Sequence, residues 1–145
     1  MRRRTATETE ILSVERRIHE AALCPELWPE VMTEFSNLTH SSMSSVLFRG
    51  ATGLISLAAL DPRIPGDAWE AYRETWAERD DLAQAAERLL PDRIGTTDDL
   101  LPSNVARRSS VWNEFYLPRD FRYILATAPR VGSVAGVATL SLIHI

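Results

Sequence analysis

The sequence predicts an α+β domain in which a mostly antiparallel sheet of about five strands is flanked by helices. Two amphipathic helix patterns come first, within residues 7–40. Strand-like segments then occur as two pairs, within residues 46–60 and 121–141, and a short connection containing glycine joins the segments of each pair. Further helical patterns lie between the pairs. Because the helices are grouped before and between the strands, the order favours an antiparallel sheet.

Length and composition indicate one ordinary globular domain. A chain of 145 residues buries about 68–70% of its unfolded surface in a single core. Hydrophobic residues make up 45% of it, but no apolar run reaches the roughly eighteen residues of a membrane span. The net charge of −4 argues against a surface that neutralises phosphates, so we expect this segment itself to hold no nucleic acid. The lone Cys24 and the absence of an apolar leader favour the cytoplasm.

Two helices are expected first. Thr7 and Glu10 have the spacing of a capping box, in which two backbone N–H groups are satisfied reciprocally. The residues expected on the buried face of this helix are Ile11, Val14, Ile18 and Ala22. Pro29 suits the first position of a second helix, where its missing N–H costs nothing. The apolar stripe of that helix is Val31, Met32, Phe35 and Leu38.

A hairpin is expected next. The serine-rich residues 41–45 interrupt the helical pattern and lead into a strand at 46–48. Residues 50–53, which begin and end with glycine, are expected to connect it to a returning strand at 54–60. Further along, Pro91 stops a short helical turn, and a brief strand is expected around Ile94.

A first cluster of aromatic side chains lies on a helix that Asp67 is expected to cap. Trp69, Tyr72 and Trp76 fall at positions i, i+3 and i+7, so their rings share one face. Such a face is most often ordinary core. It is also suited to line a small-molecule cavity, because Trp and Tyr combine apolar area with a hydrogen-bond donor.

A second aromatic cluster lies on the helix predicted for residues 105–117, which Pro118 is expected to end. Its apolar stripe consists of Val111, Trp112, Phe115 and Tyr116. The chain then changes to strand periodicity, with strands expected at 121–127 and 134–141. This cluster too is either a core anchor or a pocket wall. We expect the first cluster to face Trp112, Phe115 or Tyr123 across one cavity.

The sequence offers little support for catalysis or for a cofactor. His19, His40 and His144 are far apart, and no group of Cys, His or carboxylate residues has metal-ligand spacing, so no metal site is expected. Neither a dinucleotide-binding glycine motif nor a P-loop occurs, and the chain contains no lysine to complete a P-loop. We therefore expect a protein that is not an enzyme and holds no cofactor.

Several segments together resemble the N-terminal sensory region of LuxR-type transcriptional regulators whose sensor is GAF-like or PAS-like. They are PELWPEVMTEF, the W-x-x-Y helix that ends in acidic residues, and SSVWNEFYLPRDFRYIL. The resemblance covers nearly the whole chain. It implies an antiparallel sheet flanked by helices around a small-molecule pocket, a homodimer, and DNA binding only through a helix-turn-helix domain that follows the sensor.

The resemblance also implies candidate ligand-binding residues. In family members that bind acyl-homoserine lactones, a Trp, a Tyr and a downstream Asp-Pro contact the polar head of the ligand. Trp69 and Tyr72 resemble the aromatic pair, and Asp80 or Asp81 resembles the acid. Leu82 stands where the proline would follow Asp81, so the ligand is left unassigned. With the other rings, the candidate residues are Trp69, Tyr72, Trp76, Asp80, Asp81, Trp112, Phe115, Tyr116 and Tyr123.

The expected organisation is a sensor-like domain at residues 1–139. Residues 140–145, LSLIHI, match the translation of a transposon-end sequencing adapter, so they are interpreted as an artefactual tail or as the end of the last strand. No helix-turn-helix domain follows them. The resulting hypothesis is a small-molecule-sensing domain truncated before its DNA-binding domain. The alternative is a ligand-free dimerisation or interaction module of the same fold.

Overall fold

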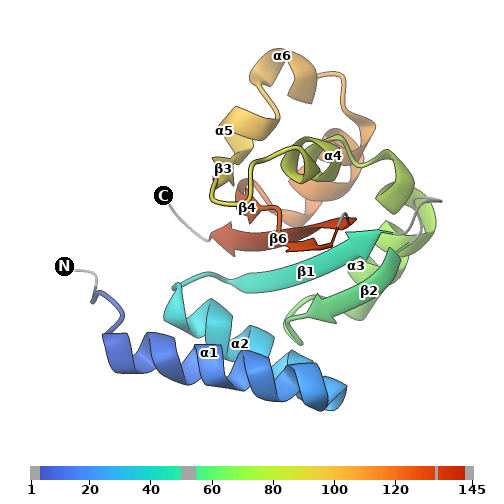
Figure 1. The fold of residues 1–145 in the computed structure, drawn as a ribbon. Helices are drawn as coiled ribbons and strands as arrows, with labels where there is room; N and C mark the ends of the chain where they lie inside the picture. The colour runs from blue at the N-terminus through green and yellow to red at the C-terminus, as the bar shows by residue number, and fades with distance from the viewer. Residues whose placement is uncertain (1–3, 50–54, 133, 143–145) are drawn as a thin grey trace.

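The computed structural model describes residues 4–49, 55–132 and 134–142. They form three layers (Figure 1): a pair of helices, an antiparallel sheet, and a second layer of short helical segments. The pair is α1 (Glu8–Leu23) and α2 (Trp28–Leu38), joined by the turn η1 (Pro25–Leu27). The second layer comprises α3 (Gly66–Ala71), η2 (Tyr72–Trp76), η3 (Ala77–Arg79), α4 (Asp81–Glu87), α5 (Thr97–Leu100), α6 (Ser103–Ala106), η4 (Trp112–Tyr116) and η5 (Leu117–Arg119).

The sheet confirms the predicted class, α+β with an antiparallel sheet. Its strands are β1 (Met43–Arg49), β2 (Ile55–Leu60), β3 (Gly95–Thr96), β4 (Tyr123–Thr127) and β6 (Val134–Leu142), in the order β2-β1-β6-β4-β3. Every neighbouring pair is antiparallel. The short β5 (Arg130–Val131) pairs with β6 beside Gly132, whose φ of 59° suits the turn. The central contact therefore joins the first strand to the last.

Helix α1 begins as predicted but buries a narrower face. The Thr7 hydroxyl accepts from the backbone N–H of Glu10 at 3.2 Å, and the Glu10 carboxylate accepts from that of Thr7 at 2.8 Å. Val14 is buried, whereas the predicted burial of Ile18 is wrong, since it is 38% exposed. Ile11 is likewise exposed at 49%. The reason is that α1 lies against α2 and not against the sheet (Figure 1), so only one stripe of it is covered.

The buried stripe of α1 continues two turns after Val14 at Ala21, which is fully buried. The predicted Ala22 is exposed. In α2, Val31 and Met32 are buried as predicted. Pro29 lies in its first turn, where no backbone donor is needed. None of the helices in the described ranges combines the length and the hydropathy that a membrane span needs.

A buried polar network fixes α2 to the sheet. Ser36 Oγ on α2 lies 2.6 Å from Asp61 Oδ2, just beyond β2, and 2.8 Å from Ser44 Oγ on β1. Ser44 Oγ also lies 2.9 Å from the Met32 carbonyl. Arg63 donates Nε to Asp61 Oδ1 at 3.0 Å and Nη2 to Oδ2 at 2.8 Å. These contacts satisfy a carboxylate that is almost completely buried.

The predicted helix at 105–117 is not continuous. Helix α6 ends at Ala106, and helical structure resumes only after Ser109, whose Oγ accepts from the N–H of Trp112 at 3.3 Å. This is the hydrogen bond of an N-cap, so Ser109 starts a new helical segment where the predicted helix would have continued. Pro118 does not end the helix but lies within η5, and the chain turns instead at Asp120, with φ 60°.

Two smaller predictions are also corrected. Asp67 lies inside the first turn of α3, and the N-cap is Pro65. The brief strand expected around Ile94 exists as β3, but it comprises only the two residues that pair with β4, so Ile94 precedes it and is 70% exposed. The predicted connection at 50–53 lies outside the described residues.

The described end of the chain belongs to the sheet. Leu140 pairs with Ser44 on β1 and with Leu125 on β4, and Leu142 pairs with Tyr123. Residues 143–145, with His144, lie outside the described residues.

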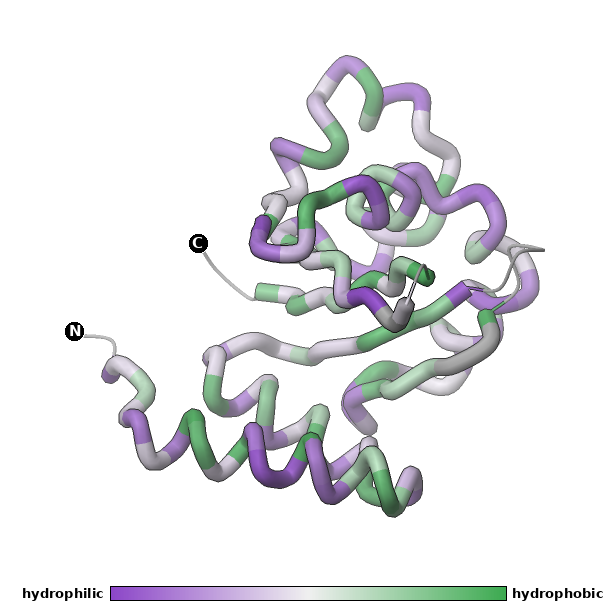
Figure 2. Tube along the Cα trace, viewed as in Figure 1, coloured by the Kyte–Doolittle hydropathy of each residue, from purple (hydrophilic) through white to green (hydrophobic). Residues whose placement is uncertain are grey.

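The core lies between the sheet and the second helical layer. Tyr72, Val111 and Phe115 are buried on the helical side, and Ile124 and Val137 on the sheet side. Figure 2 shows hydrophilic and hydrophobic residues alternating along α1, and hydrophilic stretches in the loops of the second helical layer. A functional site in this domain would therefore be expected where this core is interrupted.

Candidate functional site

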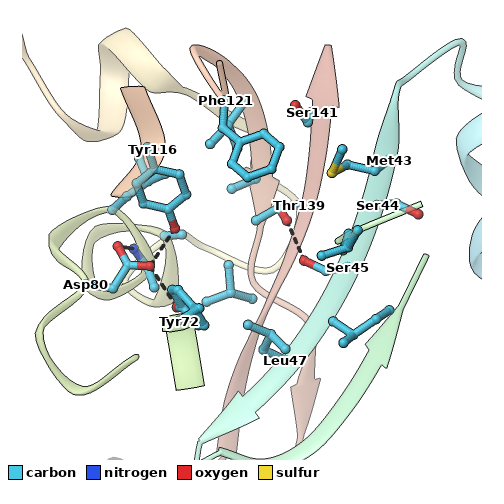
Figure 3. Close-up of a pocket in the computed structure, with 18 of the residues that line it drawn as sticks. Met43, Ser44, Ser45, Leu47, Tyr72, Asp80, Tyr116, Phe121, Thr139 and Ser141 are labelled. Atoms are coloured by element: carbon cyan, nitrogen blue, oxygen red, sulfur yellow. Dashed lines mark hydrogen bonds between the residues drawn. The ribbon is translucent and has the colours of Figure 1, made fainter. Parts of the chain in front are cut away.

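A cavity of about 100 Å³ interrupts the core between the sheet and the second helical layer (Figure 3). Strands β1, β4 and β6 provide its sheet wall, and α3, η2, α4 and η4 provide much of its helical wall. Well-packed protein interiors contain few voids larger than a water molecule. A cavity of this size with a few polar groups on its wall is therefore a candidate binding site.

The sheet wall follows the alternation of side chains along each strand. Ser45 and Leu47 on β1 and Val137 and Thr139 on β6 line the cavity, while the residues between them point to the opposite face. Ser45 pairs with Thr139 in the sheet, and their hydroxyl oxygens are hydrogen-bonded at 2.7 Å (Figure 3). This wall therefore combines apolar side chains with serine and threonine hydroxyl groups, of which Ser45 and Thr139 satisfy each other.

Asp80 is the polar centre of the helical wall. Its Oδ2 accepts hydrogen bonds from the hydroxyl groups of Tyr72 at 2.7 Å and Tyr116 at 2.6 Å (Figure 3). Its Oδ1 accepts from the backbone N–H of Ala83 at 3.1 Å, which makes Asp80 the N-cap of α4. Because the three donors belong to three segments, this one carboxylate joins η2, α4 and η4.

Burial sets the protonation behaviour of these groups. It raises the pKa of Asp80 above its ordinary value, because the carboxylate loses its hydration, and hydrogen bonds from Tyr116 and Tyr72 only partly oppose the shift. Burial and the nearby charge of Asp80 raise the pKa of both tyrosines well above the ordinary value. Both phenols therefore remain neutral donors to the carboxylate.

A second polar group at the cavity is an ion pair. Arg49, at the end of β1, donates Nε and Nη2 to Glu87 Oε1 on α4 at 2.7 and 2.6 Å. Its Nη1 donates to the carbonyl of Ala77 at 2.6 Å, at the end of the η2 turn. These contacts hold the end of β1 against the helical layer. They also mean that Arg49 is paired with Glu87 and not with Asp80.

Aromatic rings form a large part of the helical wall, beside aliphatic side chains such as Ala68 and Leu82. Phe115 lies at their centre, with its ring centroid 5.4 Å from Tyr72, 5.2 Å from Tyr116 and 6.4 Å from Phe121. Trp69 stacks on Tyr72 at 6.2 Å. Offset and edge-to-face contacts at these distances are favourable and restrict ring motion. This part of the wall is thus an aromatic surface next to the Asp80 carboxylate.

The two tyrosines come from two copies of one local structure. Residues 72–80 read YRETWAERD and residues 112–120 read WNEFYLPRD, so two aromatic residues, a glutamate, an arginine and an aspartate recur at the same spacing. In both copies a helical residue leads into a π-helix, η2 or η4, and then into a 3-10 turn. Short π-helical segments within helices occur frequently at functional sites.

The arginines repeat as well. Arg79 lies over the Trp76 ring, 4.7 Å from its centroid, and donates to the carbonyl of Thr75 at 3.0 Å. Arg119 lies over the Phe115 ring at 4.4 Å and donates to the Phe115 carbonyl at 3.2 Å. The aspartates differ, because Asp80 is buried and caps a helix whereas Asp120 is exposed in a left-handed turn.

The structure divides the nine candidate residues into two groups. The residues that line the cavity are Trp69, Tyr72, Asp80, Phe115 and Tyr116, and those that do not are Trp76, Asp81, Trp112 and Tyr123. Trp76 is buried in the core, and the Trp112 ring lies 5.9 Å from that of Tyr116 with the two planes tilted by 39°. Tyr123 is 45% exposed, on the face of β4 opposite to the buried Ile124. Of the two acids, Asp80 is the one at the cavity.

Sequence patterns did not identify the contribution of the sheet. Ser45 and Thr139 are far apart in the chain, as are Arg49 and Glu87, and only strand pairing and layer packing bring them together. The repeated nine-residue pattern was available in the sequence and could have indicated the two matching turns. In the described part of the chain, no group of three or more His, Cys, Asp or Glu side chains is arranged to hold a metal ion.

Comparisons of the chain with protein-family models, with curated proteins and with solved structures found no match.

Proposed function

We propose that this chain is a small-molecule-sensing domain of the kind found in LuxR-type transcriptional regulators, with a GAF-like or PAS-like fold. The observation that carries the proposal is the cavity, whose wall places the buried Asp80 and its two tyrosines among fixed rings. A buried carboxylate costs folding free energy unless it is well satisfied. Its position at a cavity favours a binding role over a purely structural one.

The arrangement also supports sensing. Tyr72, Ala83 and Tyr116 all donate to Asp80 from separate segments. A ligand that contacts Asp80 would change the balance among these hydrogen bonds and so the relative positions of η2, α4 and η4. A ligand can shift a conformational equilibrium only through such differential contacts. In the proposed regulator, this shift is passed to a homodimer partner and to a DNA-binding helix-turn-helix domain outside this chain.

A thermal-shift screen against small apolar metabolites tests the proposal. A ligand that binds only the folded state raises the apparent free energy of unfolding by about 2.7 kcal/mol at a hundred times its Kd. The variant Ala83→Leu, which adds volume at the cavity wall, should abolish the shift. Ala22→Leu, the same change at an exposed position on α1, should retain it. Equal shifts in both variants would place the binding elsewhere.

One observation favours the alternative, a ligand-free dimerisation module. Helix α1 exposes several large apolar side chains, namely Ile11, Leu12, Ile18 and Leu23. Exposed apolar residues gathered on one helix are a feature of interaction surfaces. In this alternative, Ile18→Glu converts a dimer to a monomer in analytical ultracentrifugation, and no compound in the screen stabilises the protein.

A further inference from the structure

The charge of the cavity wall is unbalanced. The groups that donate hydrogen bonds to the Asp80 carboxylate, among them Tyr72, Tyr116 and the Ala83 N–H, are neutral, which is the pattern around an ionised carboxylate. Asp80 itself is fully buried. The other two charged side chains on the wall, Arg49 and Glu87, form an ion pair with each other. Within the described residues, no ion pair includes Asp80, so the wall carries one net negative charge.

The rings around this charge favour the same kind of partner. Trp69, Phe115 and Phe121 line the cavity together with the two tyrosines. The face of an aromatic ring attracts cations, and rings that surround a cavity are the usual means of binding ammonium groups. A carboxylate at the wall of such a cavity adds a direct charge–charge attraction, which is strong where water is excluded.

We propose that the ligand of this cavity is a small organic amine, bound as its ammonium ion with the charge beside Asp80 and a short apolar body against the rings. This inference rests on the proposed sensing function. The cavity volume of about 100 Å³ is below the roughly 150 Å³ of an apolar cavity that holds benzene, so the body is only a few carbons long.

Other ligand classes fit this wall less well. An anionic ligand would place a second negative charge close to Asp80, and the repulsion between the two charges would oppose binding. A neutral ligand leaves the buried charge uncompensated, and its donor would have to compete with Tyr72 and Tyr116 for Oδ2. An ammonium ion neutralises the wall and contacts the ring faces, and its charge-assisted hydrogen bond competes for the carboxylate more strongly than that of a neutral donor.

Three compounds of equal length test the inference: n-butylamine, butan-1-ol and butyrate, at neutral pH and matched ionic strength. Amide chemical shifts of cavity residues such as Leu47 and Ala83 report binding at the site. We expect the amine to bind about tenfold more tightly than the alcohol, because its hydrogen bond is charge-assisted, and butyrate to leave the shifts unchanged. An alcohol that binds as tightly as the amine would overturn the inference while leaving the sensing function intact.

Two variants test whether Asp80 causes the preference for the amine over the alcohol. Asp80→Asn should bring the amine and the alcohol to within about threefold of each other. Asp81→Asn removes a charge one residue away, outside the cavity wall, and should keep the full preference. A preference that survives Asp80→Asn also overturns the inference. If none of the three compounds perturbs the cavity residues of the wild-type protein, the sensing function fails with it. The wild-type comparison decides the matter even if Asp80→Asn does not fold.

Discussion

The hydroxyl of Tyr116 lies 2.6 Å from Oδ2 of Asp80, across 36 residues of sequence. This hydrogen bond holds two parts of the second helical layer together. It joins Tyr116, the last residue of η4, to Asp80, which follows η2 and η3. Tyr72 donates to the same oxygen at 2.7 Å. The stability of the layer should therefore depend on both phenols.

Tyr116→Phe should lower the free energy of unfolding by about 1.5–3 kcal/mol, the usual range for a hydrogen bond to a charged group. The ring and its packing are retained, so the loss reports the hydroxyl. Urea denaturation measures it. Tyr123→Phe is the matched control, since Tyr123 is 45% exposed and its change should be close to zero. Equal effects at the two positions would contradict the role of Asp80 as a buried acceptor.

Tyr72→Phe and Tyr116→Phe should not be additive. Both phenols donate to one oxygen of Asp80, so once the first hydroxyl group is removed, the free energy of unfolding depends more strongly on the second. A double-mutant cycle should give a coupling free energy of about 0.5–3 kcal/mol. A coupling of zero would show that each hydroxyl has a partner other than Asp80.

Phe115→Ala should cost about 3–5 kcal/mol, because the ring is buried and lies at the centre of the aromatic wall. Trp112→Ala should cost less, although the side chain is larger, since Trp112 is only partly buried. Chemical denaturation of the two variants under one set of conditions gives the order. The reverse order would place the main anchor of this segment at Trp112.

Two buried aspartates should give opposite dependences of stability on pH. Burial raises the pKa of Asp61, but hydrogen bonds from Arg63 and Ser36 outweigh it and hold that pKa below its ordinary value. Its contribution is therefore present above the unfolded pKa and is lost as the pH falls through the folded pKa. The pKa of Asp80 is raised, so the folded state takes up a proton first, and protonation of Asp80 increases stability as the pH falls.

Urea unfolding of Asp61→Asn and Asp80→Asn from neutral to acidic pH separates these contributions. Asp61→Asn should weaken the loss of stability in acid relative to the wild type. Asp80→Asn should make that loss steeper, because it removes a group that gains a proton on folding. The same pH profile in both variants would contradict the opposite pKa directions.

Gly136→Ala should destabilise the sheet by about 1–3 kcal/mol, the range for overpacking. A Cβ at Gly136 on β6 would lie 2.7 Å from the Phe48 ring and 2.9 Å from the carbonyl of Leu47. Gly66→Ala is the control, because a Cβ there meets no atom within 4 Å and its φ is not in the left-handed region. Thermal unfolding of the two variants should show a lower Tm only for Gly136→Ala.

The sequence by itself determined the class of the fold and most of its elements. Several elements depend on residues a few positions apart, so their patterns can be recognised in the sequence alone. They are the capping box of Thr7, the apolar stripe with Val31 and Met32, and the two strands at the end of the chain. The aromatic residues around the cavity were identifiable for the same reason, since Trp69 and Tyr72 are three positions apart in one helical stretch.

Only the tertiary structure decided what those rings surround. Helical periodicity could not show that two of the segments are π-helical, or that the helix predicted for residues 105–117 is interrupted at Ser109. It could not select Asp80 over Asp81 either, because both are acids at a helix start and only burial against two tyrosines distinguishes them. Pairing of the first strand with the last brings Ser45 to Thr139, and packing of the layers brings Arg49 to Glu87. The cavity is a property of those distant contacts, which local sequence patterns do not encode.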